Sequence, residues 1–225
     1  MPAPAALLTR AHYDARPSLP VTGPLELTLA RAHEICGAAR RTLALVIAAV
    51  RPGPVLWIAP DWLPERLNGP GLCEWIDPGR ITFVHAAREA DLLWTLEEAL
   101  RAGIVPCVVG ELPHTPGLTA VRRLHLAAEQ GSTKSAHPRQ APLGLLLSPH
   151  DGAAGGAPGI ESRWALHPAH TSDPARDPAH TPAAPDLPDA PGWRLERLRA
   201  RSAPPATWPA APTLRDGRQS LSITT

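Results

Sequence analysis

The stretch AHEICGAARRTLALVIAAV, residues 32–50, decides the fold class. Its first part belongs to the segment ARAHEIC (30–36), which suits a strand, and its second part, ARRTLALVIAAV (39–50), has the apolar density of a buried helix. Gly37 stands in the short turn between them. A strand that leads through a turn into a helix is the building unit of α/β folds.

The same alternation of short apolar runs and helical patterns continues to about residue 167. The predicted strands and helices are VLWIA (55–59), ITFVH (81–85), a helix at 88–103, VPCVVGEL (105–112), a helix at 119–131 and LGLLLSP (143–149). Strands that are apolar throughout and separated by helices are typical of a parallel sheet covered on both faces. We therefore predict an α/β fold with a mostly parallel sheet and helices on both faces.

Changes in composition divide the chain into four predicted parts. These are an irregular N-terminal arm (1–28), an α/β core (29–167), a Pro-rich flexible linker (168–191) and a C-terminal tail element (192–225). At the end of the core, RWALH (163–167) alternates like a strand at the sheet edge. In the tail element, WRLERLRAR (193–201) is predicted to be either a strand or one short helix. The segment 213–222 is predicted to be a hairpin around Asp216-Gly217, so the tail holds a small β element.

The overall charge excludes one class of partner interaction. The chain of 225 residues has 22 Lys+Arg against 21 Asp+Glu, a formal net charge of +1, which excludes coating of nucleic acid through bulk charge. No apolar run approaches the ~20 residues that a membrane-spanning helix needs, and the N-terminus lacks a secretory pattern. Three cysteines without metal-binding spacing favour a reducing compartment, so we expect a cytoplasmic protein.

The motifs of common enzymes and metal sites are missing. The sequence contains no HExxH, no GxSxG and no paired CxxC, so we predict no catalytic residue, no metal and no cofactor. Cys36, Cys73 and Cys107 stand in apolar runs and are predicted to be small buried hydrophobes. Glu97 and Glu98 are predicted to lie on a solvated helix face.

The strand–turn–helix at 32–50 resembles the RecA family of recombinase ATPases around their phosphate-binding loop. EICG (34–37) matches the end of the strand that enters the loop, and the apolar residues from Thr42 onward match the helix after it. The later runs follow the same order of elements, so the resemblance covers roughly residues 29–167 and implies a RecA-like core.

This chain departs from the pattern that a working phosphate loop needs, G-x-x-x-x-G-K-[ST]. Between Gly37 and the helix only five residues remain, the second Gly is missing, and Arg40 or Arg41 stands in place of the Lys. Gly110 occupies the position of the metal-binding acid, and Glu111, one residue later on a strand, points to the opposite face. Gly37, Arg40, Arg41 and Thr42 are therefore predicted to be a degenerate, non-functional phosphate loop.

A reduced core of this kind resembles the ImuA-type inducible mutagenesis proteins. The resemblance lies in an ordered set of short segments, HEICGAARR (33–41), GPVLWI (53–58), EADLLWTLEEALRAG (89–103), VVGEL (108–112), TAVRRLHLAAE (119–129) and WRLERLR (193–199). The chain departs from the family in a shortened segment before HEICG and in its repetitive 168–191 stretch.

The resemblance implies a non-catalytic accessory role in SOS-type, damage-induced mutagenesis. Its implied partners are an inactive Y-family polymerase homologue of the ImuB type and an error-prone second copy of the replicative polymerase catalytic subunit, with RecA as a further candidate. The alternatives from other classes are a weak ATP-binding or DNA-binding relative of RecA that uses Arg40, Arg41 and Thr42, and a regulator of a recombinase or of cell division.

The tail combines apolar and arginine side chains, the mixture that dominates interface hot spots. The candidate partner-binding residues are Trp193, Arg194, Leu195, Arg197, Leu198 and Arg199. The alternative is an edge strand that packs Trp193 back on the sheet, and contact with single-stranded DNA is a third possibility, since arginines with exposed aromatics suit it.

Overall fold

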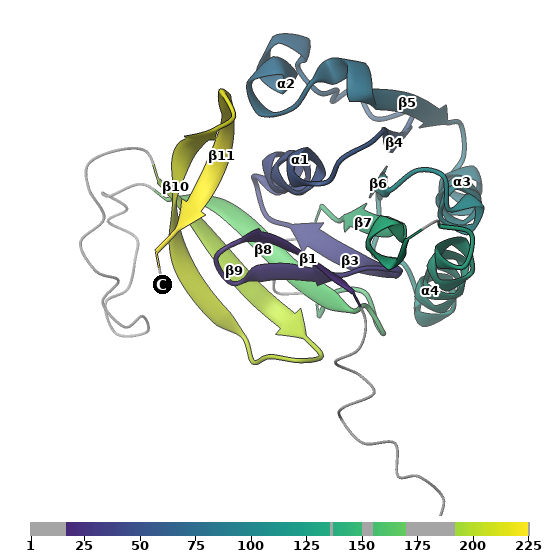
Figure 1. Cartoon of the computed structure of the whole chain (residues 1–225). Helices are drawn as coiled ribbons and strands as arrows, with labels where there is room; N and C mark the ends of the chain where they lie inside the picture. The colour runs from purple at the N-terminus through teal and green to yellow at the C-terminus, as the bar shows by residue number, and fades with distance from the viewer. Residues whose placement is uncertain (1–16, 136, 150–154, 170–191, 225) are drawn as a thin grey trace, which may run out of the picture.

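Nine of the described strands form one large mixed sheet (Figure 1), and β1 and β2 form a separate two-stranded sheet. The computed structural model describes residues 17–135, 137–149, 155–169 and 192–224. Nine strands have the order β11-β10-β9-β8-β3-β7-β6-β4-β5. Their bounds are β3 (Arg31–Cys36), β4 (Val55–Pro60), β5 (Ile81–Ala86), β6 (Cys107–Glu111), β7 (Leu143–Leu147), β8 (Ser162–Ala169), β9 (Gly192–Ala200), β10 (Ala206–Arg215) and β11 (Arg218–Ile223). Strands β3 to β8 pair in parallel, and β9, β10 and β11 are antiparallel to their neighbours.

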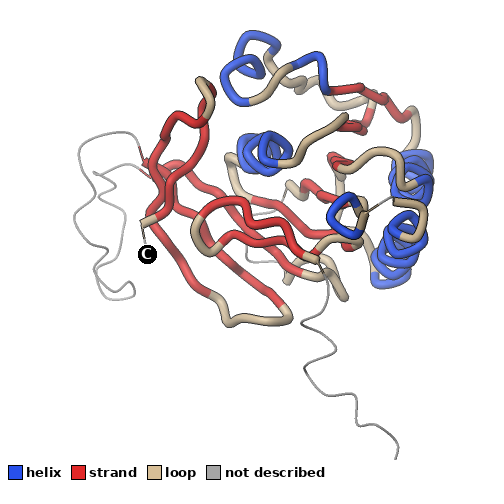
Figure 2. Tube along the Cα trace, viewed as in Figure 1, coloured by secondary structure: helices blue, strands red, loops and turns tan. Residues whose placement is uncertain are grey.

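Helices cover the two faces of the parallel part (Figure 2). Helices α1 (Arg40–Val50) and α2 (Gly69–Trp75) contribute to one hydrophobic cluster, which also holds Trp57, Ile35 and Trp164. Helices α3 (Glu89–Ala102) and α4 (Leu118–Ser132) contribute to a second cluster on the opposite face. Short 3₁₀ turns occupy Pro78–Arg80 and Pro138–Gln140. The predicted α/β fold, with a mostly parallel sheet, helices on both faces and C-terminal β strands, is confirmed.

The predicted N-terminal arm is not irregular over its second half. Strands β1 (Ser18–Thr22) and β2 (Leu25–Thr28) form an antiparallel hairpin, while residues 1–16 lie outside the described part. Leu25 and Leu27 alternate with polar residues on β2, and both are fully buried against the cluster under α1. The prediction was wrong here because each strand is too short to show a period in a segment crowded with prolines.

The C-terminal strands extend the sheet. Strand β9 lies between β8 and β10, so residues 192–224 belong to the same sheet as the parallel core. The predicted hairpin around Asp216-Gly217 is confirmed, with φ of +52° and +75° at these residues, and β10 starts earlier than predicted, at Ala206. Of the predicted linker, residues 170–191 lie outside the described part.

Two predictions about single side chains were wrong. Glu97 is buried rather than solvated, because its two carboxylate oxygens bind Arg101 on the same helix and Arg123 on α4, the latter at 2.7 Å. Cys73 is exposed, because helix α2 buries Leu72 and turns the next residue to solvent. The described helices include none that is both long and apolar enough to cross a membrane.

The cysteines give a simple test of this arrangement. Cys36 and Cys107 are buried, and burial raises the pKa of the Cys107 thiol to about 12, so neither thiol is expected to react with Ellman's reagent in the native protein. Only the exposed Cys73 is expected to react quickly, and all three are expected to react in denaturant. A C73S variant that still released one equivalent rapidly would contradict the burial of the other two.

His33 on β3 makes the stability depend on pH. The neutral ring donates from Nε2 to the Thr28 carbonyl at 2.9 Å and accepts at Nδ1 from the Ser162 hydroxyl at 2.6 Å. Burial lowers its pKa from 6.5 to about 4, although the Thr28 bond opposes this shift. As the pH falls, the unfolded chain therefore takes up the proton first, and stability declines from about pH 6.5 down to about pH 4.

The expected loss between pH 7 and pH 4 is about 3 kcal/mol of unfolding free energy. Urea unfolding across this pH range measures it. An H33Q variant is expected to lose most of the slope, while H85Q, at an exposed position on the edge strand β5, should keep it. A wild-type protein as stable at pH 4 as at pH 7 would contradict a buried neutral His33.

Candidate functional site

The turn after β3, where a phosphate loop would lie, is bound to the protein itself. The backbone N–H of Ala39 donates to the Leu166 carbonyl of β8 at 3.0 Å, and that of Arg40 donates to the Gly37 carbonyl at 3.1 Å. Gly37 has a φ of +88°, and a Cβ at this position would come within 2.5 Å of the Leu166 carbonyl oxygen. A phosphate loop needs free N–H groups that converge on the anion. Here, the Ala39 N–H is bound by the Leu166 carbonyl of β8 and is therefore not available to an anion.

Arg41 closes the same region from the first turn of α1. Its Nε and Nη2 donate to Glu111 Oε2 at 3.0 and 2.6 Å, and its Nη1 lies 3.2 Å from Glu65 Oε2. Trp57 Nε1 donates to the other Glu111 oxygen at 2.8 Å. Both carboxylate oxygens of the buried Glu111 are thus satisfied within the protein. We call Arg41, Glu111 and Trp57 the Arg41 cluster.

The Arg41 cluster lies where α/β folds usually bind ligands, beyond the carboxyl ends of the parallel strands. Glu111 ends β6, and Arg41 follows the turn after β3. A guanidinium that is already bound twice by a buried carboxylate is not free to bind a phosphate without leaving that carboxylate unpaired. The arrangement therefore ties α1 to β6, and its chemistry is that of a structural ion pair.

Glu111 is the residue whose role sequence reasoning missed. Gly110 and Glu111 do face opposite sides, because a Cβ on Gly110 would meet the Leu96 side chain of α3 at 2.5 Å while Glu111 meets Arg41 of α1. The alternation of side chains between the two faces of each strand could have indicated this role. Trp57 pairs with Val109, which places Trp57 and Glu111 on the same face of the sheet as α1.

The other predicted loop residues contribute less. Arg40 and Thr42 are half-buried, and their side chains make no hydrogen bond or ion pair with the residues that the structure describes. The structure thus brings Gly37 against β8 and Arg41 against Glu111, without assembling the four predicted residues around one point. Among the described ranges, His, Cys, Asp and Glu nowhere gather in a group of three that could hold a metal.

The tail residues divide between the two faces of β9. Leu195 is fully buried, and Trp193 is half-buried against the same cluster. The Arg197 guanidinium lies 5.7 Å from the Trp164 ring centroid and 5.0 Å from that of Trp208, and its Nε donates to the Pro204 carbonyl at 2.8 Å. These three side chains serve the packing of the sheet, as the packing alternative expected, although β9 is an internal strand.

The remaining tail residues stay accessible. Arg199 is exposed, Leu198 is half-buried at a register shift between β8 and β9, and Arg194 pairs with Glu196 at 2.5 Å while remaining partly open to solvent. Of the six predicted partner-binding residues, only Leu195 is buried, Arg199 is exposed, and Trp193, Arg194, Arg197 and Leu198 are half-buried and remain partly open to a partner.

Comparisons with known proteins find similarity among solved structures. A comparison with models of protein families finds no match, and a comparison with curated proteins finds none. Among solved structures, the chain is similar to SulA from Pseudomonas aeruginosa, with a TM-score of 0.42 and 22% sequence identity over 53% of this chain and 98% of the SulA chain. The function proposed below rests on the sequence and the contacts of this chain.

Proposed function

We propose that this protein is a non-catalytic adaptor of the DNA-damage response, which binds an inactive Y-family polymerase homologue of the ImuB type and joins it to an error-prone polymerase. The Arg41 cluster is the observation that supports a non-catalytic role for this adaptor. Arg41, one of the two arginines that stand in place of the lysine of a phosphate loop, is bound by the buried Glu111, and the loop N–H of Ala39 is bound by β8.

The ordered resemblance to ImuA-type proteins supports the choice of partner. Its segments include the strand before the closed loop, the helix α3 and the tail strand β9. An adaptor of this kind acts by raising the local concentration of one polymerase near the other, and it needs no chemistry of its own.

Nucleotide titration tests the non-catalytic part of the proposal. Isothermal titration of Mg-ATP into the full chain is expected to show no saturable binding below about 1 mM, since each charge-assisted hydrogen bond that a phosphate loses costs roughly a decade or more in affinity. Saturable binding below about 0.1 mM that R41A abolishes would contradict it and would favour the ATP-binding alternative.

Co-purification tests the partner. The full chain and the Y-family homologue from the same cell are co-expressed, and the complex is isolated at low and at high salt. A 1:1 complex that withstands high salt is expected for an interface with an apolar centre. No complex at low salt would contradict the adaptor proposal.

The accessible side of β9 is tested within the same complex. Deletion of the whole tail is unsuitable, because it removes three strands of the nine-stranded sheet. An R199A variant instead removes an exposed side chain, and it is expected to weaken the complex if β9 contacts the partner. R122A, an exposed arginine on α4, is the matched control.

A further inference from the structure

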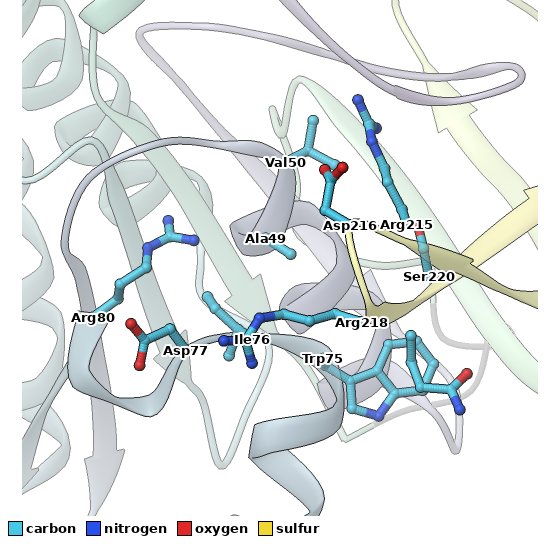
Figure 3. A pocket seen from close by; sticks show the side chains of 11 residues that line it. Ala49, Val50, Trp75, Ile76, Asp77, Arg80, Arg215, Asp216, Arg218 and Ser220 are labelled. Carbon is cyan, nitrogen blue, oxygen red and sulfur yellow. The ribbon is translucent and has the colours of Figure 1, made fainter.

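A pocket of about 350 Å³ lies at the other end of α1 from the Arg41 cluster (Figure 3). It is formed by the last residues of α1, the end of α2 with the turn after it, and the β10–β11 hairpin. Helix α1 separates it from Arg41 by nine residues, roughly 14 Å along the helix axis. The pocket therefore lies at the amino ends of the parallel strands and is independent of the closed loop.

Apolar side chains form one part of the pocket wall. Ala49 and Val50 come from α1, and Trp75 and Ile76 come from the end of α2. Ile76 is buried and Trp75 is half-buried against the core, so part of the Trp75 side chain remains open to a ligand. The volume lies at the lower end of the range for ligand pockets, which suits one or two side chains rather than a large cofactor.

Charged side chains form the rim. Figure 3 shows Arg215 and Asp216 projecting from the hairpin on one side and Asp77 and Arg80 on the other, with Arg218 extending toward Ile76. Three arginines face two aspartates, which leaves one surplus positive charge at the pocket. The rim is thus matched to a single negative charge.

The three arginines differ in how far they are already bound. Arg80 donates to the Gly53 carbonyl at 2.8 Å, to the Ala48 carbonyl at 3.0 Å and to the Arg51 carbonyl, and so it closes the end of α1. Arg218 donates from Nη1 to the Cys73 carbonyl at 2.7 Å, which fixes its position and leaves other N–H groups unbound.

Arg215 is exposed on the rim. Within the described residues, its side chain makes neither a hydrogen bond nor an ion pair. Arg215 and Arg218 therefore retain donors for a ligand at the edge of the pocket, next to its apolar wall.

We infer that this pocket binds a short protein segment in which a carboxylate side chain is next to an apolar one. The apolar side chain would cover Val50, Trp75 and Ile76, and the carboxylate would accept charge-assisted hydrogen bonds from Arg215 and Arg218. Tryptophan and arginine together are typical of the centre of a protein interface. The inference takes from the proposed function only that this chain binds another protein.

A peptide carboxylate fits the rim better than a phosphate does. Asp77 and Asp216 stand among the arginines, and neither makes an ion pair within the described part of the chain. Both would repel the two negative charges of a phosphate monoester, whereas one carboxylate balances the surplus of one. A phosphate would also leave the Trp75 side of the pocket uncovered.

A minimal peptide tests the pocket directly. N-acetyl-Leu-Asp-Leu amide is titrated into the ¹⁵N-labelled full chain, and the amide shifts around Ile76 and Gln219 are followed by NMR. Saturable shifts with a Kd of about 1 mM or below are expected for so small an anchor. The matched peptide with Asn in place of Asp is expected to bind at least about tenfold more weakly.

Variants of the protein complete the test. R215A removes no hydrogen bond or ion pair within the described structure and is expected to weaken peptide binding about tenfold, while R122A on α4 is expected to leave peptide binding unchanged. The inference is overturned by pocket amides that do not respond at about 10 mM peptide, by an Asn peptide that binds equally well, or by inorganic phosphate that shifts the same amides at lower concentration.

Co-purification of the variants with the Y-family homologue distinguishes failure of the pocket proposal from failure of the proposed function. If the wild-type protein forms no complex with the Y-family homologue, the proposed function is contradicted. The tripeptide titration still shows whether the pocket binds a peptide carboxylate. If the complex forms and R215A weakens it relative to R122A, the pocket is part of the interface. If the complex forms and R215A leaves it unchanged, the pocket is not the site at which this partner docks.

Discussion

An E111A variant is expected to lose about 4 kcal/mol of unfolding free energy. The substitution removes both hydrogen bonds from Arg41 and leaves the buried Trp57 Nε1–H without an acceptor. The Arg41 side chain is only 22% exposed, and Glu65 is the one other carboxylate that it contacts in the described structure. Breaking one partner of a largely buried pair is costly because the remaining charge loses its compensation.

Urea denaturation followed by circular dichroism measures this loss. E111Q is the matched control, because an amide oxygen still accepts from Trp57 or Arg41 at nearly the same volume, and its expected cost is about 1–2 kcal/mol. E65A, at a residue whose side chain is two-thirds exposed, is expected to cost less than about 1 kcal/mol. An E111A loss no larger than that of E65A would show that the Arg41 cluster contributes little to stability.

E111A is also informative for function. Loss of the carboxylate frees Arg41, yet the Ala39 N–H stays bound to the Leu166 carbonyl. The variant is therefore expected to remain unable to bind Mg-ATP. Recovery of nucleotide binding in E111A would mean that the ion pair alone closes the site, and that the turn can adapt to a phosphate.

The parallel part of the fold could be predicted from local sequence because short strand-like runs alternate with helical patterns along the chain. The runs predicted at 30–36, 55–59 and 81–85 differ from β3, β4 and β5 by at most one residue at each end. Strands β4 and β7 are almost wholly buried and apolar on both faces, and Gly103 ends α3 in the left-handed conformation that favours glycine. In these segments, local preference and tertiary packing favour the same structure.

The elements that sequence reasoning missed are those that depend on distant contacts. Strand β10 contains Pro209 and Pro212, which argue locally against a strand, yet it pairs with β9 on one side and β11 on the other. Likewise, β2 is only four residues long and is held by burial of Leu25 and Leu27. The part of β10 before the predicted segment 213–222, and the whole of β2, have too little local signal to be separated from a loop.

The candidate site could be predicted only in part, because some of its contacts join residues that are distant in sequence. The shortened turn and its arginines were visible in the sequence, because a phosphate loop is a local motif. The pairing of Arg41 with Glu111 joins residues 70 positions apart, and it required the order of β3, β7, β6 and β4 in the sheet. The pocket beside Arg215 and Arg218 also joins segments that are distant in sequence, which is why no motif indicated it.

A G37A variant is expected to be the most damaging single change in the turn, with a loss of about 4 kcal/mol or more of unfolding free energy. Two costs combine at this position. A φ of +88° is strained for alanine, and the added Cβ would come within 2.5 Å of the Leu166 carbonyl oxygen. That oxygen belongs to the backbone of β8 and also accepts from Ala39, so it cannot move without breaking this contact.

G217A separates the two costs. Gly217 also has a positive φ, +75°, but a Cβ there would meet nothing within 4 Å. Its replacement is therefore expected to cost only about 1 kcal/mol, from backbone strain alone. Thermal and urea unfolding of both variants measure the difference, which reports how tightly the turn packs against β8. Equal losses in G37A and G217A would show that the turn is free to move away from Leu166, and would reopen the case for a loop able to accept a phosphate.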